Sequence, residues 1–139
     1  MTGLVARVLV YGTLRRGMAN HDRFCFDIVD VIPAWTRGRL YALPYGFPAM
    51  VPADDGRVIG ELLFFPDPAA ALHRLDHLEG FRPDGPCHYD RIVVEAHLLA
   101  GGETVRAWCY VYGDGAAQRL VGAKVLAAGD WARVDPSRP

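Results

Sequence analysis

A turn directly after a hydrophobic strand is the first place where this sequence could do chemistry. Bulky, uncharged residues run through Val8-Leu9-Val10 and are followed by Tyr11-Gly12-Thr13-Leu14-Arg15. Gly12 predicts backbone angles that are closed to other residues, so that the chain reverses just past the strand end. Successive backbone N–H groups in such a turn can converge on a carboxylate or a developing oxyanion. The alternative is a plain tight turn with solvated arginines, and this segment alone leaves both interpretations open.

The second place is the end of a predicted helix over Asp67–Glu79. Asp67 is a typical cap, Pro68 suits the first turn, and Gly80 suits the left-handed stop of a helix. At about 100° per residue, the hydrophobic residues form one stripe. Its members are Ala71, Leu72, Leu75 and Leu78. The opposite face carries His73, Arg74 and His77, and Asp76 lies at the border.

Glu79 falls inside the hydrophobic stripe of this helix, at about 20° from Leu72 on the helical wheel. Burial penalises a carboxylate, and the partial negative charge of the helix C-terminus disfavours a further anion there. Both effects are expected to raise the pKa of Glu79, and a glutamate tuned towards neutrality can serve as general acid and base. The alternatives are a frayed last turn with Glu79 in solvent, or a salt bridge from Glu79 to an arginine.

The remaining chain predicts strands and turns that would position these two sites. Residues 4–11 form the first strand, and Met18–Phe26 predicts a helical turn. Further extended segments are predicted for Ile28–Ile32 before Pro33, for Thr36–Ala42, and for Val58–Phe65 after a hairpin turn at Asp54-Asp55-Gly56. The segment Leu43–Pro48 is predicted to form neither a helix nor a paired strand.

A long hairpin of Tyr89–Leu99 and Thr104–Tyr112 follows the helix, with Ala100-Gly101-Gly102 at its tip. In its return strand the odd positions from Val105 to Val111 share one face, and the even positions from Trp108 to Tyr112 share the other. Both faces are largely hydrophobic, which is typical of a barrel or a covered sheet. The Gly- and Ala-rich region after Gly113 predicts one short element near Leu120–Leu126.

Composition limits the class of protein. The 139 residues predict a single domain over 1–139, and 51% hydrophobic residues argue against disorder. The formal net charge of −1 favours neither nucleic acid nor an anionic membrane as a partner. The sequence has no membrane-spanning run and no signal-peptide pattern at its start, and its three cysteines form no disulfide framework. We therefore expect a cytoplasmic protein; its oligomeric state is not predicted.

Other catalytic constellations are weaker. His73 and His77 have the spacing of a metal pair, but they lie on the polar helix face without a matching third ligand, so no metal site is predicted. His21-Asp22 near Cys25 could suggest a thiol nucleophile, yet the neighbours of Cys25 are phenylalanines, which is typical of an inert core cysteine.

Five ordered motifs make the sequence resemble the γ-glutamylcyclotransferase-like (AIG2-like) family. They are Tyr11-Gly12-Thr13-Leu14-Arg15, Gly38-Arg39-Leu40-Tyr41, Val58-Ile59-Gly60-Glu61-Leu62, Leu75-Asp76-His77-Leu78-Glu79-Gly80 and Tyr89-Asp90-Arg91. The matches run from about residue 8 to residue 112. The resemblance implies a mixed α/β fold, a small β-barrel with few helices, in which the Tyr-Gly-Thr-Leu loop and Glu79 face one cavity.

Family members release 5-oxoproline from γ-glutamyl amines or peptides, whereas others have no established activity. The resemblance implies that Glu79 is the catalytic acid/base. It also implies that backbone N–H groups of Gly12, Thr13 and Leu14 hold the carboxylate or γ-carbonyl oxygen of a small γ-glutamyl substrate, without metal or cofactor. Tyr11 is predicted to be half core and half cavity wall.

The side chains of Arg15 and Tyr89 are further candidates for substrate binding. Arg15 could steer an acidic substrate or brace the loop through a carboxylate, and the brace is favoured. Tyr89 could hydrogen-bond the substrate or Glu79. The alternative function is a non-catalytic protein of the same fold that binds a small carboxylate or a protein partner. A carboxylate at Glu79 favours the enzyme, because an anion-binding site would do better without it.

Overall fold

The structure is a computed structural model. It describes residues 7–12, 15, 28–43, 48–79, 89–112, 120, 122–126 and 129–130, and for Glu79 the backbone only. The predicted helical turn at Met18–Phe26 and the two residues Thr13 and Leu14 lie outside the described residues.

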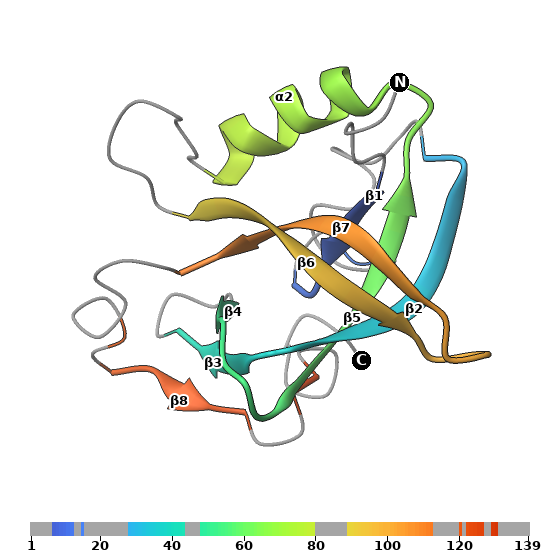
Figure 1. The fold of residues 1–139 in the computed structure, drawn as a ribbon. Coiled ribbons are helices and arrows are strands. Elements are labelled where there is room, and N and C mark those ends of the chain that lie inside the picture. Colours follow the sequence, from blue (N-terminus) through green and yellow to red (C-terminus); the bar gives the residue numbers. More distant parts are fainter. Residues whose placement is uncertain are drawn as a thin grey trace, which may run out of the picture.

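Within the described residues, five strands close a barrel (Figure 1). Around the barrel they are β1 (Arg7–Val10), β5 (Arg57–Phe64), β2 (Asp30–Arg37), β6 (Asp90–Leu98) and β7 (Thr104–Val111). All neighbours pair antiparallel except β1 and β7, which close the barrel in parallel with Val8 opposite Trp108. The pairing is short at two seams of the barrel, between β1 and β7 and between β2 and β6.

Alternation along β7 divides the core into two clusters. Ala107, Cys109 and Val111 pack with Leu9 and Leu62 in one cluster, where Val105 lies at the margin. Tyr110 and Tyr112 pack in the other cluster, with Trp108 against it. The two predicted faces of this strand are therefore confirmed, and so is the predicted hairpin with β6.

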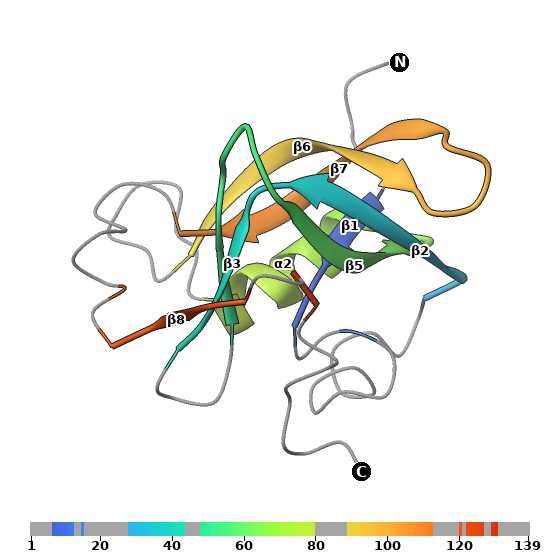
Figure 2. The ribbon, with the colours of Figure 1, turned by 90° about the horizontal axis from the view of Figure 1, so that it is seen from below.

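Helix α2 (Pro68–Glu79) packs on the second of these clusters. Ala71, Leu72 and Leu75 are buried there together with Val8 and Leu63, and Leu78 packs against them. Figure 1 shows α2 lying along one side of the barrel, and the view in Figure 2 places it behind the strands. The predicted hydrophobic stripe is confirmed, and the mixed α/β fold with a small barrel is confirmed as well.

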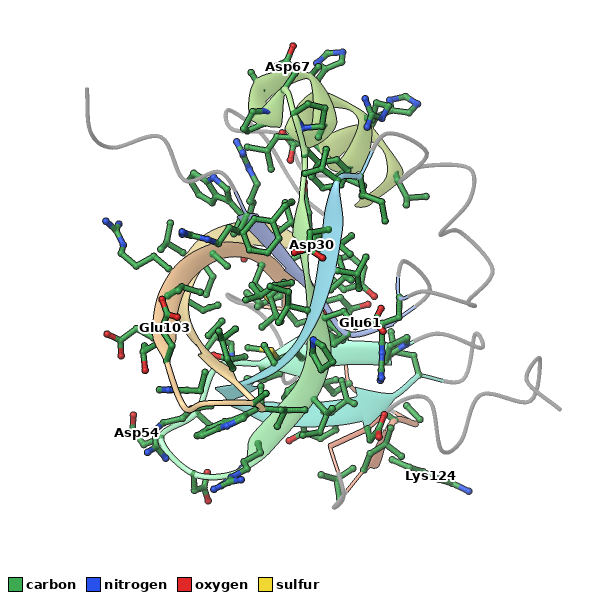
Figure 3. All side chains as sticks on the ribbon, turned by 90° about the vertical axis from the view of Figure 1, so that its right-hand side faces the viewer. Asp30, Asp54, Glu61, Asp67, Glu103 and Lys124 are labelled. Atoms are coloured by element: carbon green, nitrogen blue, oxygen red, sulfur yellow. The ribbon has the colours of Figure 1, made fainter. Side chains whose placement is uncertain are left out.

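A second, three-stranded sheet covers the opposite end of the molecule. It consists of β4 (Pro48–Val51), β3 (Arg39–Ala42) and β8 (Lys124–Val125), in that order. Figure 3 shows Asp67 at the start of α2 and Lys124 in β8 at opposite ends of the molecule. β8 corresponds to the short element predicted near Leu120–Leu126.

Two of the predicted strand boundaries are wrong. The strand predicted over Thr36–Ala42 is divided at Gly38, because β2 belongs to the barrel and β3 to the second sheet. β2 also continues through Pro33 instead of ending before it. Pro33 lies opposite Leu99, just beyond the short pairing of β2 with β6, and its carbonyl accepts a 3.2 Å hydrogen bond from Leu99 N. Proline can donate no bond in return, which is tolerated at the end of this pairing.

The prediction for the region around Pro48 is also wrong in part. Pro48 starts β4 and lies opposite Ala42, although Leu43–Pro48 was expected to pair with nothing. Proline is tolerated there because it is the first residue of its strand. The turn at Asp54-Asp55-Gly56 is present, with Gly56 at φ 80°, but it is no hairpin. It connects β4 of one sheet to β5 of the other, and these two strands do not pair.

Candidate functional site

The turn after β1 lies against the start of β4. The carbonyl of Gly12 accepts a 3.0 Å hydrogen bond from Arg15 N, which closes a reverse turn. The tight turn is present as predicted. The predicted reason for the glycine is wrong, because the φ angle of Gly12 is not positive. A Cβ at Gly12 would lie 2.7 Å from Pro48 Cγ, so glycine is needed for this close approach.

Tyr89 contacts the same proline, although it is 41 positions away from Pro48 in the sequence. It is buried just before β6, and its hydroxyl donates a 2.7 Å hydrogen bond to the carbonyl of Pro48. Its ring packs at a tilt against Tyr112, with 4.9 Å between centroids. The structure therefore brings together two sequence-predicted site residues, Gly12 and Tyr89, through a proline that the sequence had placed in a loop.

The side chain of Tyr11 connects three strands at this end of the barrel. Its ring is buried, and its hydroxyl donates a 2.6 Å hydrogen bond to the Tyr110 carbonyl in β7. The same hydroxyl accepts a 3.1 Å hydrogen bond from Met50 N in β4. Tyr112 N in turn donates to the Met50 carbonyl at 2.8 Å. This hydroxyl thus fixes the end of β1, from which the turn departs.

Arg15 is held by an acidic residue near the end of the described chain. Its Nη1 lies 2.7 Å from Asp130 Oδ1, and both side chains are mostly buried. Among the described residues, Arg15 Nε has no hydrogen-bond acceptor. The neighbouring segment is fixed to the barrel, because the carbonyl of Gly129 accepts a 2.7 Å hydrogen bond from Ile59 N in β5. The geometry agrees with the favoured role of Arg15 as a brace for the loop.

Helix α2 starts as its sequence predicts. Asp67 Oδ1 accepts a 3.2 Å hydrogen bond from Ala70 N, and the Asp67 carbonyl accepts one from Ala71 N. The helix ends at Glu79, where the described part of this segment also ends. Position 79 lies on the same row of the helix as Leu72 and Leu75, both of which are buried. The side chain of Glu79 lies outside what the structure describes.

Asp76 connects the last turn of α2 to the barrel. Its Oδ1 accepts a 2.6 Å hydrogen bond from the Tyr110 hydroxyl and lies 3.2 Å from Arg91 Nε in β6. The Arg91 guanidinium also lies over the ring of Trp108, 4.5 Å from its centroid. Asp76 therefore bonds to an arginine and a tyrosine of the barrel wall.

Sequence reasoning had not assigned Pro48, Tyr110 or Asp130 to the site. The only local signal was for Tyr110, whose alternation in β7 placed it on the face that meets α2. Pro48 and Asp130 belong to the site because they bond to residues that are distant in the sequence. Pro48 accepts from Tyr89, and Asp130 accepts from Arg15. Such contacts leave no periodicity that a sequence pattern could reveal.

The described part of the chain offers no group of three or more His, Cys, Asp or Glu residues that could hold a metal ion. His73 and His77 are both exposed on α2, and Cys109 is buried in the barrel. In the same segments, no helix is long and hydrophobic enough to cross a membrane.

Comparison with known proteins identifies the family. The described strands place the chain among small mixed α/β proteins with a closed five-stranded barrel and a helix packed on its outside. The model of the family described as gamma-glutamyl cyclotransferase, AIG2-like matches residues 8–133. The chain therefore belongs to the gamma-glutamyl cyclotransferase, AIG2-like family. A comparison with curated protein sequences gives no significant match.

Solved structures share the fold. An AIG2-like protein from Mus musculus is 25% identical, with a TM-score of 0.64 over 79% of this chain and 78% of that chain. A uropathogenic E. coli-specific protein is 17% identical, with a TM-score of 0.65 over 94% of this chain and 95% of that chain. A glutathione-specific gamma-glutamyl cyclotransferase from yeast is 15% identical, with a TM-score of 0.53 over 78% and 69%.

Proposed function

We propose that this protein is an enzyme that releases 5-oxoproline and a free amine or amino acid from a small γ-glutamyl substrate. Membership in the gamma-glutamyl cyclotransferase, AIG2-like family supports this class of reaction. The yeast protein of the same fold is specific to glutathione, which makes γ-glutamyl peptides one class of substrate to test. Free γ-glutamyl amino acids and γ-glutamyl-lysine-type amines are the other classes.

One observation carries the proposal. The loop that starts at Tyr11 and the helical turn that ends at Glu79 are both bonded to the same strand, β7. Tyr11 donates to the Tyr110 carbonyl, and Asp76 accepts from the Tyr110 hydroxyl. This arrangement supports a site in which a general acid/base on α2 and oxyanion donors after β1 act on one substrate.

Glu79 is the proposed acid/base, and one carboxyl is sufficient for both proton transfers. The α-ammonium of the γ-glutamyl group first loses a proton to Glu79, because only the free amine can attack. The amine nitrogen then bonds to the γ-carbonyl carbon and closes a five-membered ring. When the bond between that carbon and the leaving nitrogen breaks, Glu79 returns the proton to the leaving amine. Glu79 then takes the second proton of the ring nitrogen and passes it to the released amine, which departs as an ammonium ion, so that 5-oxoproline keeps one N–H and Glu79 ends as a carboxylate. Proton transfer of this kind contributes about 10²–10⁴-fold.

Holding the substrate in its folded conformation is the second contribution. The attacking and attacked groups belong to one molecule, so correct orientation can supply a large part of the roughly 7–11 kcal/mol available from proximity. Backbone N–H groups of Gly12, Thr13 and Leu14 are proposed to bind the substrate carboxylate or the developing oxyanion. At the ends of this segment, Gly12 lies too close to Pro48 to carry a Cβ, and Arg15 is held by its ion pair with Asp130.

Tyr89 is proposed to contact the substrate as a hydrogen-bond acceptor. Its single hydroxyl proton is donated to the Pro48 carbonyl, so the oxygen has only lone pairs to offer. A lone pair suits the N–H groups of the substrate's α-ammonium better than it suits a carboxylate. Arg15 is proposed to act on an acidic substrate mainly through the loop that it braces, and Tyr11 through the loop that it anchors.

The test is 5-oxoproline release from the three classes of γ-glutamyl compound by the wild type and by Glu79→Gln. The substitution keeps the shape of the side chain and removes its acid/base function. Glu103→Gln is the matched control, because it removes the same charge at the exposed tip of the β6–β7 hairpin, far from α2 in Figure 3. We expect wild-type turnover on at least one class, retained by Glu103→Gln and reduced at least about 10²-fold by Glu79→Gln.

Two other outcomes would change the proposal. Turnover that survives Glu79→Gln would keep the reaction and remove Glu79 as its acid/base. A folded wild type that turns over none of the compounds would contradict the enzyme and favour the non-catalytic alternative, a protein that binds a small carboxylate or a protein partner. Circular dichroism of all variants distinguishes loss of chemistry from loss of fold.

A further inference from the structure

Tyr110 is bonded to both halves of the proposed site at once. Its hydroxyl donates a 2.6 Å hydrogen bond to Asp76 Oδ1 in the last turn of α2. Its backbone carbonyl accepts a 2.6 Å hydrogen bond from the Tyr11 hydroxyl at the end of β1. One residue of β7 thereby connects the turn that carries Glu79 to the loop that would bind the oxyanion.

The connection to α2 has the features of a strong hydrogen bond. A 2.6 Å distance between a hydroxyl and a carboxylate oxygen is typical of a charge-assisted bond. Tyr110 is only 4% exposed, so water competes little for the bond. Arg91 places its positive charge 3.2 Å from the same oxygen, and its guanidinium is itself held over the Trp108 ring. Asp76 is thus fixed from two strands, β6 and β7.

The position of Asp76 in the last turn of the helix explains how this bond can affect Glu79. The last turn of a helix lacks partners for its carbonyls and frays unless other contacts hold it. Asp76 and Glu79 belong to that same turn, and at about 1.5 Å per residue they are separated by less than one helical pitch. A contact that fixes Asp76 therefore limits the movement available to Glu79.

We propose that Asp76 and Tyr110 are positioning residues that hold Glu79 at a fixed distance from the Tyr11 loop. This inference rests on the proposed function, since it assigns the two residues a role in the reaction of that site. They act through Glu79 and the loop, and the step that depends on them is proton transfer. Displacing a catalytic group by about 1 Å can cost about 10²-fold in rate.

The first experiment compares Tyr110→Phe with the wild type on the best substrate. The substitution keeps the buried ring and removes the bond to Asp76. We expect kcat to fall about 10- to 100-fold while KM stays within about twofold, because the geometry of proton transfer changes more than substrate binding. Thr36→Val is the control, since it removes another buried hydroxyl, the one that donates to the Glu95 carbonyl at 2.9 Å in the barrel wall. We expect Thr36→Val to lose about as much Tm as Tyr110→Phe does and to keep the wild-type kcat.

The second experiment asks whether the two residues act through one contact. Asp76→Ala should lower kcat at least as much as Tyr110→Phe, and adding Tyr110→Phe to Asp76→Ala should lower it no further. Asp76→Asn keeps an oxygen that can accept from Tyr110, and it should retain more of kcat than Asp76→Ala does. Multiplicative effects of the two substitutions, or a Tyr110→Phe variant with wild-type kcat or with a change in KM alone, would overturn the positioning role.

Failure of this inference differs from failure of the proposed function in the same assay. An active wild type whose kcat is unaffected by Tyr110→Phe contradicts the positioning role only. A folded wild type without turnover contradicts the proposed function, and the positioning role then falls with it.

Discussion

Arg15 Nη1 and Asp130 Oδ1 lie 2.7 Å apart, although their residues are separated by 115 positions in the sequence. The side chains are 12% and 20% exposed, so the pair is largely shielded from water. It connects the turn after β1 to the segment that follows β8, and that segment is itself fixed to β5 through Gly129. The substrate-binding loop of the proposed site is therefore braced by the far end of the chain.

Asp130→Asn is expected to lower the free energy of unfolding by about 1–3 kcal/mol, because it leaves the mostly buried Arg15 charge without its anionic partner. Urea unfolding at neutral pH measures the change. The matched control is Asp55→Asn, which removes the partner of Arg39 in an ion pair whose side chains are 53% and 70% exposed. An unfolding midpoint close to that of the wild type is expected for this control. Equal losses of unfolding free energy in the two variants would contradict the prediction, because shielding from water would then not strengthen the Arg15–Asp130 pair.

Gly12→Ala is expected to reduce both stability and turnover. Its Cβ would meet the rigid ring of Pro48, so either the turn or the start of β4 must shift, at a cost of about 1–3 kcal/mol. A shift of the turn displaces the proposed oxyanion donors, and kcat/KM should fall at least about tenfold. Gly101→Ala provides the comparison, because its φ of 87° makes the substitution strained while nothing lies within 4 Å of the added atom. Gly101→Ala should lose stability and keep its turnover per folded molecule; equal losses of turnover in both variants would refute the prediction.

Tyr89→Phe is expected to affect substrate binding more than catalysis. The variant loses the hydrogen bond to the Pro48 carbonyl and the lone pair that is proposed to face the substrate. An increase in KM of about tenfold, with kcat changed by less than about threefold, is expected from the loss of one hydrogen bond. Steady-state kinetics on the preferred substrate give both values. A change confined to Tm would assign Tyr89 to stability alone.

The Arg39–Asp55 pair predicts a specific pH dependence of stability. Its hydrogen bond and the positive charge of Arg39 hold the pKa of Asp55 below its usual value. A carboxyl with a lowered folded-state pKa stabilises the fold above its unfolded-state pKa, and this contribution disappears as the pH falls through the folded-state value. The difference in Tm between the wild type and Asp55→Asn should therefore be small at pH 7 and vanish in acid. A difference that grows as the pH falls would contradict this assignment.

Elements defined by contacts between near neighbours could be predicted from the sequence. The cap at Asp67, the hydrophobic row through Leu72 and Leu75, and the alternating faces of Thr104–Tyr112 all agree with the structure. Each depends on a periodicity or a capping preference that is written within a few residues. The motifs around Gly12 and Glu79 were sufficient to indicate the family.

Apart from the hairpin of β6 and β7, the pairing of the strands could not be predicted in this way. Gly38 divides one extended run between two sheets, and Pro48 starts a strand in a region that looked like a loop, because each depends on a partner that the topology supplies. The reason for Gly12 also changed, from its backbone angle to its contact with Pro48.

The sequence by itself determined the cap and hydrophobic row of α2, the alternating faces of β7 and the family. The catalytic and substrate-binding residues that it suggested stay predictions. Only the tertiary structure decided that Arg15 pairs with Asp130, that Tyr89 donates to Pro48, and that Tyr110 connects Tyr11 to Asp76. The physical reason is the range of the interactions. Capping and periodicity act over a few residues, whereas a hydrogen bond between distant segments exists only once the barrel has closed and brought its donor and acceptor together.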